Sequence, residues 1–138
     1  MVVVNQIRRG RHCVFQMHVH LVFVAKYRRR MFDKDAIDRL RIIFQKVCTH
    51  FEAQLIELDG ERDHVHLLIH YPPKHSLSSL VNSLKGVSSR LLRAQHPYIG
   101  QMLYGKEVLW SPSYFAASCG GAPISILKEY IESQKTPD

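Results

Sequence analysis

The chain has 138 residues, of which 46% are apolar and 22% are charged, and these values are ordinary for a single globular domain with its own core. The sequence contains no run of about 18 apolar residues, which excludes a membrane-spanning helix. Lysine and arginine outnumber the acidic residues by 19 to 12, giving a net charge of +7. This charge suits a polyanionic partner such as nucleic acid, but a merely soluble basic surface explains it equally well.

The N-terminus and the cysteines both favour a cytoplasmic protein. The first apolar run is too short for a secretory signal, and its charges follow it instead of preceding it. Cys13, Cys48 and Cys119 are odd in number, widely spaced and form no CxxC pair. We therefore expect reduced thiols and a cytoplasmic location.

The first predicted element is a long strand over residues 12–25. Its side chains alternate, so that Phe15 and Val19 share an apolar face while His18 and His20 share the other. A helix then follows, because apolar residues recur at helical spacing through residues 34–50.

Two more strands are predicted at residues 51–60 and 63–71, separated by the turn signal Asp59-Gly60. Residues 76–94 predict a second helix and residues 109–118 a fourth strand. Pro123 then opens a last helix over residues 123–135.

The order of these elements, βαββαβ plus a C-terminal helix, predicts the α+β ferredoxin-like fold that RNA-recognition domains share. In this fold two helices cover one face of a four-stranded antiparallel sheet. The first and third strands are then central neighbours, and residues 1–138 form a single domain.

Two His-Val-His tripeptides lie in the first and third predicted strands. His64 and His66 are two residues apart, so their side chains project from one face, where two imidazoles can chelate a divalent metal. His18 and His20 obey the same geometry, and spacing does not separate the two pairs. For an isolated pair of this kind, polar residues on an open sheet face are the commoner explanation.

The last helix carries Tyr130 and Gln134, whose spacing stacks them on one helical face. A tyrosine phenol can attack phosphorus and hold a covalent intermediate, and a glutamine carbonyl is an acceptable ligand for Mg²⁺ or Mn²⁺. Taken alone, a helix-surface tyrosine and glutamine without a role is the more common case.

Five segments together resemble the single-tyrosine transposases that move insertion sequences as single-stranded DNA. The segment DHVHLLI at 63–69 resembles the HUH motif of this family (His, bulky hydrophobe, His). The other four segments are HLVFVAKYRRR at 20–30, SLSSLVNSLKGVSSRLLR at 76–93, LWSPSYFAAS at 109–118 and GGAPISILKEYIESQ at 120–134. The resemblance extends from His18 to Lys135 and rests on the order of these segments.

The resemblance implies a metal-dependent enzyme in which Tyr130 is the nucleophile and His64, His66 and Gln134 hold one Mg²⁺ or Mn²⁺ ion. It implies cleavage of single-stranded DNA at hairpin-bearing ends, with a 5′-phosphotyrosine link and a free 3′-hydroxyl. His20 matches a strand position of the family, whereas His18 is either a bystander or a residue that supports the metal ligands from behind. The bond energy is conserved, so no nucleotide cofactor is expected.

The resemblance also implies a homodimer in a bacterial or archaeal cell, associated with the nucleoid. Gly120-Gly121 is expected to act as a hinge that lets the tyrosine helix serve the neighbouring subunit, although an ordinary turn fits these glycines too. Residues 1–11 have no clear family counterpart and are expected to be a flexible basic arm. Asp63 alternates away from the histidine face, which argues against a role as ligand.

Two groups of basic residues are candidates for phosphate contacts: Lys26, Arg28, Arg29 and Arg30 after the first strand, and Lys85, Arg90 and Arg93 on the second helix. Three aromatic side chains fit either the core or a platform for unpaired bases: Tyr27, Tyr114 and Phe115. Trp110 is assigned to packing.

Three alternatives to a mobile-element enzyme remain. One is a non-catalytic module that binds single-stranded nucleic acid on the same sheet, although the aromatic strand motif of RNA-recognition domains is missing. Another is a domesticated relative associated with repeated extragenic palindromes (REP). A metal-binding protein without DNA activity is disfavoured by the net charge.

Overall fold

The computed structural model describes residues 7–103, 107–118 and 124–134, with the side chains of residues 124–128 left out. Within these ranges, no helix combines the length and the apolar character needed to span a membrane.

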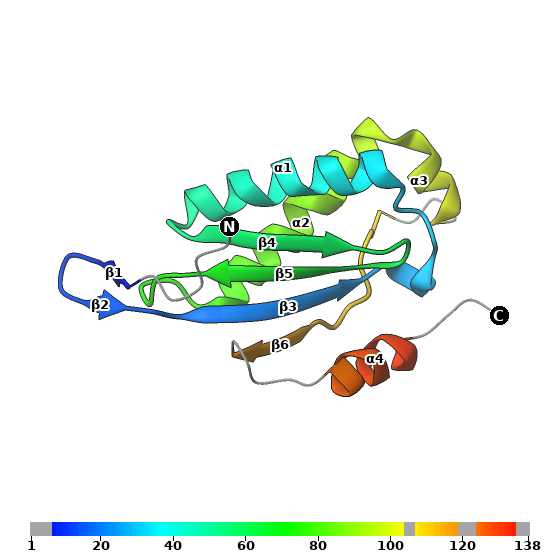
Figure 1. Ribbon diagram of the computed structural model, residues 1–138. Coiled ribbons are helices and arrows are strands. Elements are labelled where there is room, and N and C mark those ends of the chain that lie inside the picture. The colour runs from blue at the N-terminus through cyan, green and yellow to red at the C-terminus, as the bar shows by residue number, and fades with distance from the viewer. Residues whose placement is uncertain (1–6, 104–106, 119–123, 135–138) are drawn as a thin grey trace.

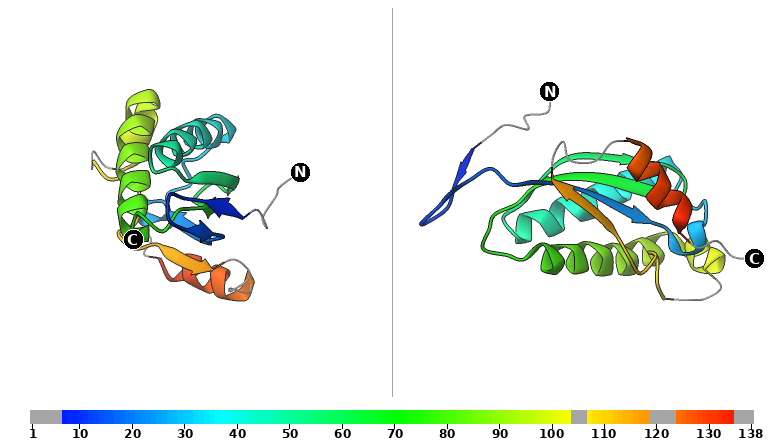
Figure 2. Two further views of the ribbon diagram at one scale, coloured as in Figure 1. Left: turned by 90° about the vertical axis from the view of Figure 1, so that its left-hand side faces the viewer. Right: turned by 90° about the horizontal axis from the view of Figure 1, so that it is seen from below.

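The centre of the molecule is a four-stranded antiparallel sheet with the order β4-β5-β3-β6. Its strands are β3 (His18–Val24), β4 (Gln54–Gly60), β5 (His64–His70) and β6 (Phe115–Ser118). Helices α1 (Lys34–His50) and α2 (Leu77–Gln95) cover one face of this sheet (Figure 1). Helix α4 (Ile124–Ser133) lies on the opposite side (Figure 2). This is the predicted ferredoxin-like arrangement, and the first and third predicted strands are its central pair.

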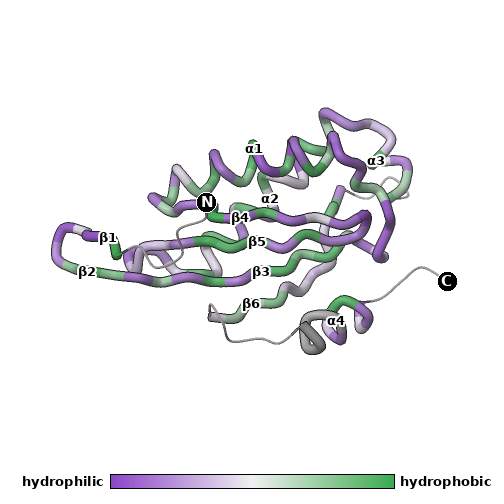
Figure 3. Tube along the Cα trace, viewed as in Figure 1, coloured by the Kyte–Doolittle hydropathy of each residue, from purple (hydrophilic) through white to green (hydrophobic). Residues whose placement is uncertain are grey.

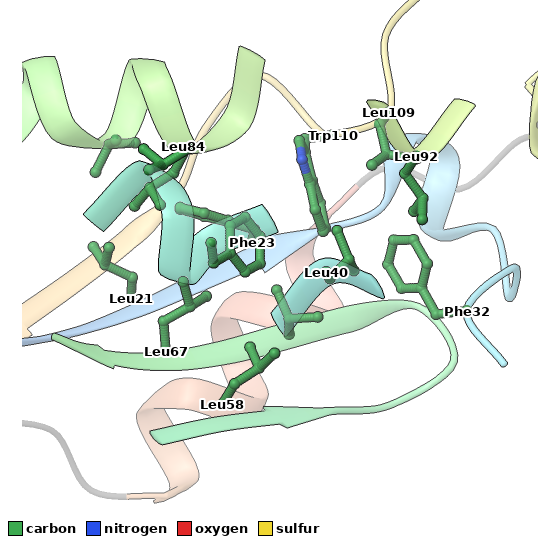
Figure 4. Packing of buried hydrophobic residues seen from close by; sticks show 14 of the residues in the cluster. Leu21, Phe23, Phe32, Leu40, Leu58, Leu67, Leu84, Leu92, Leu109 and Trp110 are labelled. Atoms are coloured by element: carbon green, nitrogen blue, oxygen red, sulfur yellow. The ribbon is translucent and has the colours of Figure 1, made fainter. Parts of the chain in front are cut away.

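The core lies between the sheet and the two covering helices. Alternate residues of the central strands enter it, including Leu21, Phe23 and Leu67, each at most 1% exposed. Trp110 packs among Phe23 and other aromatic side chains there (Figure 4), which confirms its assignment to packing. Because one face of the sheet is committed to this core, the alternate residues of β3 and β5 remain for a site on the other face.

Capping residues explain where the two long helices begin. The Asp33 carboxylate accepts a hydrogen bond from the Ala36 amide, and the Ser76 hydroxyl accepts one from the Ser79 amide. The helices therefore match their predicted ranges to within a residue. Two short helices were not predicted, η1 (Lys26–Arg28) and α3 (Pro97–Met102).

Residues 7–17 differ from the prediction of an arm followed by one long strand, while residues 1–6 of the predicted arm lie outside the described residues. Strand β1 (Arg8–Arg9) pairs with β2 (Val14–Phe15) in a small hairpin beyond the start of β3 (Figure 1). Gln16 and Met17 interrupt the strand, so the alternation restarts at His18. Phe15 consequently packs against His70 on the outer face of the sheet, and not on the core face with Val19.

The last strand is shorter than predicted. Only Phe115–Ser118 forms β6, while Trp110 makes an isolated bridge to Ala25 at the end of β3. Pro112 lies between them, and proline has no amide hydrogen to donate to a strand ladder. The segment before β6, residues 111–114, is therefore free to form the contacts with α4 described below.

Candidate functional site

The paired histidines of β5 lie on the outer face of the sheet, at the end where the β4–β5 turn meets the end of β3. His64 pairs with Val24 and His66 with Val22 in the antiparallel register. The two imidazole rings are adjacent, with centroids 5.0 Å apart and ring planes at 72°. The β4–β5 turn beside them is hydrophilic, whereas the end of β3 is apolar (Figure 3).

A hydrogen bond that alternation did not predict holds the first of these rings. Asp63 is only 8% exposed, and its Oδ1 accepts a hydrogen bond of 2.7 Å from His64 Nδ1. The other carboxylate oxygen lies 3.5 Å from Arg28 Nε. Because Asp63 precedes the first residue of β5, strand alternation does not fix its direction.

The surroundings of the second ring, His66, favour its neutral form. Burial lowers the pKa of His66, and the nearby His64 and His20 rings lower it further, against smaller opposing effects of Asp59 and Glu61. A neutral imidazole is the form that ligates metal ions.

Both rings border an open cleft of about 840 Å³. Acidic side chains outnumber basic ones around it by five to two, which favours a cation and disfavours a bare phosphate. Among the described residues, however, no group of three or more His, Cys, Asp or Glu side chains is arranged to hold a metal ion. The cleft is lined by His20, Arg28, Arg30, Glu57, Asp59, Gly60, Glu61, Asp63, His64, His66, Leu67, Leu68, Ile131 and Glu132.

The register separates the two His-Val-His segments. His20 lies opposite Leu68 and still reaches the cleft, but His18 lies opposite His70 at the far end of the sheet. The His18 and His70 rings stack with centroids 4.5 Å apart and planes at 16°. Stacked rings direct their in-plane nitrogen lone pairs side by side instead of toward one point, so this pair is a poor chelator. Phe15 covers His70 from the edge.

Tyr130 and Gln134 do not meet the paired histidines in this conformation. The Tyr130 hydroxyl shares a hydrogen bond of 2.8 Å with Ser113 Oγ, and its ring packs on Phe115 at 5.6 Å. Gln134 Oε1 accepts hydrogen bonds from Ser111 Oγ at 2.8 Å and from Ser113 Oγ at 3.2 Å. The three side chains predicted as ligands are therefore not brought together.

The sheet register relates Phe115, on which the Tyr130 ring packs, to the histidines. Phe115 on β6 pairs with Val22 on β3, and Val22 pairs in turn with His66 on β5. Two strand spacings separate Phe115 from His66, which corresponds to about 10 Å. The phenol is thus docked on the β6 side of the molecule, while Ile131 and Glu132 of the same helix reach the cleft. Burial raises the pKa of Tyr130, and the hydrogen bond with Ser113 partly opposes this.

Lys85 holds the segment on which Tyr130 docks. Its Nζ donates to the carbonyl oxygens of Ser111 at 2.8 Å, Ser113 at 3.2 Å and Pro112 at 3.3 Å. Burial lowers the pKa of this lysine. The structure therefore places Lys85 inside the protein's own hydrogen-bond network, where its role is to fix the turn before β6.

The other predicted phosphate contacts fall into two groups. Arg28 and Arg30 line the cleft beside the paired histidines, and Lys26 Nζ lies over the Tyr27 ring at 5.3 Å. Arg90 and Arg93 belong to α2, on the opposite face of the sheet, and Arg93 Nε donates to Ser89 Oγ. Only the first group shares a surface with the candidate site. Arg29 follows Arg28 and is partly buried.

Phe115 packs against Tyr130, and Tyr114 packs against the core. The expected hinge, Gly120-Gly121, lies outside the described residues. Ser111 and Ser113 were missed by sequence reasoning, since serine is common in turns and their spacing carries no chemical signature.

Together these features define a class: a ferredoxin-like protein with a paired-histidine cleft and a tyrosine-bearing helix on the open face of its sheet. Residues 13–134 match the family model described as "Transposase IS200 like". The chain belongs to the IS200-like transposase family, which makes it a transposase and confirms the resemblance noted from its motifs.

Two curated relatives cover almost the whole chain. The ISDra2 transposase TnpA of Deinococcus radiodurans is 30% identical over 129 residues, which are 94% of this chain and 91% of that protein. The transposase of insertion sequence IS200 from Salmonella typhimurium is 31% identical over 92% of this chain and 82% of its own length.

Two solved structures are also similar. A crystal structure of a transposase candidate from Deinococcus radiodurans R1 superposes with a TM-score of 0.84 at 28% identity, covering 94% of this chain and 99% of that one. It confirms the predicted α+β fold. A REP-associated tyrosine transposase bound to a REP hairpin has a TM-score of 0.56 at 13% identity, covering 91% of this chain and 68% of that one, a likeness of fold alone.

Proposed function

We propose that this transposase nicks and rejoins single-stranded DNA at the hairpin-bearing ends of its insertion sequence, through a 5′-phosphotyrosine intermediate. The observation that carries the proposal is the cleft that His64 and His66 share with residues of the tyrosine helix. Substantial similarity to insertion-sequence transposases along nearly the full chain supports the mobile-element function over a REP-associated one.

The covalent step exchanges one phosphoester for another. The Tyr130 oxygen attacks the phosphorus and loses its proton, while the bond from phosphorus to the 3′-oxygen breaks and that oxygen takes up a proton. A later attack by a 3′-hydroxyl on the phosphotyrosine reverses these changes and rejoins DNA. No net bond energy is lost, so the proposal requires no nucleotide cofactor.

His64 and His66 suit a divalent cation, and Mg²⁺ or Mn²⁺ held there would polarise the scissile phosphate and offset its negative charge. The fit rests on the adjacent rings, on the carboxylate that engages His64, and on the acidic rim of the cleft. Gln134 would complete the set of ligands once the helix has moved.

Movement of α4 is part of the proposal, because Tyr130 is hydrogen-bonded to Ser113 and packs on Phe115, a residue two strand spacings from His66. The helix would leave this contact and present Tyr130 and Gln134 to a histidine pair. We propose a homodimer in which the pair belongs to the neighbouring subunit, with Gly120-Gly121 as the hinge.

DNA would enter over the open face of the sheet. Arg28 and Arg30 border the cleft and would contact the phosphates that flank the scissile bond. Arg90 and Arg93 lie on the helical face, so they would contact DNA only if it wraps around the domain.

A covalent-adduct assay tests the proposal. The protein is mixed with labelled single-stranded DNA from the flanks of its gene, with and without Mn²⁺, and run on a denaturing gel. We expect a metal-dependent protein–DNA band that is lost in Tyr130→Phe and His64→Ala. Tyr71→Phe and His50→Ala, which change the same residue types away from the cleft, should keep it.

Two further results would decide against this function. Equal adduct formation with the same DNA made double-stranded would contradict a single-stranded substrate. A tight complex on a native gel without any covalent band would support the non-catalytic binding module instead.

A further inference from the structure

We infer that Asp63 is a positioning residue that fixes the His64 ring in the tautomer whose Nε2 nitrogen is free to bind a metal ion. The inference rests on the proposed metal-dependent function and adds a residue to it. Asp63 was expected to face away from the site, and only the structure brings its carboxylate to His64.

The short contact determines the tautomer. An ionised carboxylate can only accept hydrogen bonds, so the proton in the 2.7 Å contact belongs to His64 Nδ1. A neutral imidazole carries one ring proton, which leaves Nε2 as the nitrogen with the free lone pair. Metal-binding histidines commonly donate their second ring nitrogen to a carboxylate in this way, which also fixes the ring orientation.

Asp63 is itself held from several sides. Its carbonyl oxygen accepts a hydrogen bond of 2.8 Å from the Ala25 amide at the end of β3. Its side chain is 12% exposed, so water competes little for the carboxylate. Such a fixed and buried acceptor can hold the His64 ring in one orientation before any metal ion arrives.

Arg28 forms an ion pair with the second carboxylate oxygen. Its Nε lies 3.5 Å from Asp63 Oδ2, and its backbone adopts a left-handed conformation with φ of 52°, directly after Tyr27 with φ of 60°. Two consecutive non-glycine residues in this region are unusual, and such backbones persist where the surrounding structure requires them. The bend brings the Arg28 guanidinium back to Asp63.

These contacts argue against a direct metal–Asp63 bond. One oxygen accepts a hydrogen bond from His64, and a cation at the other would meet the like charge of the Arg28 guanidinium. Two other carboxylates of the cleft rim belong to Asp59 and Glu61, which take no part in the contacts of Asp63 with His64 and Arg28. Their substitution provides matched controls for loss of a negative charge.

The first test measures the tautomer without any metal. Two-bond ¹⁵N–¹H correlation spectra of the full chain, at a pH where the imidazoles are neutral, report which nitrogen carries the proton. We expect the Nδ1–H form for His64 in the wild type and in Asp59→Asn, and a mixture of tautomers in Asp63→Ala. The same Nδ1–H population in Asp63→Ala would overturn the inference.

The second test measures Mn²⁺ binding to the protein without DNA, by electron paramagnetic resonance. We expect Asp63→Ala to weaken binding about 10- to 100-fold, the range found for partners of metal-ligating histidines. Asp63→Asn, whose amide oxygen can still accept from Nδ1, should bind more tightly than Asp63→Ala. It also keeps the test informative if the alanine variant fails to fold.

The two tests separate failure of the inference from failure of the proposed function. Equal weakening in Asp63→Ala, Asp59→Asn and Glu61→Gln would assign the effect to charge and overturn the inference. A wild type that binds no Mn²⁺ would contradict the metal site, while the tautomer spectra would still show whether Asp63 controls His64.

Discussion

Replacing Ser113 with alanine should speed the reaction of Tyr130 with DNA. The serine hydroxyl shares a 2.8 Å hydrogen bond with the phenol, which lies on the β6 side of the sheet away from the paired histidines. A neutral hydrogen bond contributes about 0.5–1.5 kcal/mol. Since about 1.4 kcal/mol corresponds to a factor of ten, loss of this bond should raise the undocked population, and with it the rate, by about two- to tenfold.

The assay is single-turnover formation of the covalent adduct, with protein in excess over labelled single-stranded DNA and saturating Mn²⁺. Ser113→Thr keeps the hydroxyl and should react close to the wild-type rate. Ser118→Ala removes an exposed serine of β6 and serves as the control for a general effect on this strand.

Two outcomes would refute the reasoning. An unchanged rate in Ser113→Ala would mean that leaving the docked position does not limit the reaction. A slower rate would mean that Ser113 supports the phenol during the chemical step, and not only in the docked conformation.

Three further predictions concern stability and ionisation. Ser88→Ala should lower the free energy of unfolding by about 1–3 kcal/mol, because the buried indole N–H of Trp110 loses its acceptor, Ser88 Oγ, at 2.9 Å. An unchanged midpoint of chemical denaturation would contradict this. Gly60→Ala should destabilise the fold, since its Cβ would lie 2.3 Å from Ile37 Cδ1. Ile37→Val removes that methyl group and should restore part of the lost stability in the double variant. If the stability losses of the two single variants simply add, there is no such clash. Tyr130 should titrate above its usual pKa of 10.0 in ¹³C NMR, because burial raises it. Its contribution to stability should therefore be intact below pH 10 and decline as the pH rises above it, whereas a pKa at or below 10 would contradict the dominance of burial over the Ser113 hydrogen bond.

The elements that the sequence predicted best are those with long periodic patterns and clear ends. Helix α1 begins at the Asp33 cap and runs to His50 as predicted, because 17 residues contain several turns of apolar spacing. Helix α3 was missed, since six residues give too few turns for such a pattern. The long first strand was split because alternation cannot reveal that Gln16 and Met17 break the pairing.

The candidate site was predicted in its parts but not in its assembly. Strand alternation correctly placed His64 and His66 on one face, because that rule depends only on local backbone geometry. The docking of Tyr130 on Ser113, 17 residues away, depends on how α4 packs, and no local pattern encodes it. Asp63 was misread for a related reason, since a residue just outside a strand does not follow the alternation.

The register of the central strands gives the repeated tripeptide a further meaning. Leu21 pairs with Leu67, and a local twofold axis through this pair, normal to the sheet, superposes His18 on His64 and His20 on His66. The two histidine pairs therefore occupy equivalent backbone positions in the ladder. Met17 occupies the position equivalent to Asp63, so the first pair has no carboxylate beside it. The His18 ring stacks on His70 and not beside His20. The symmetry of an antiparallel ladder offers two candidate metal sites, and the neighbours of each copy decide which one can be used.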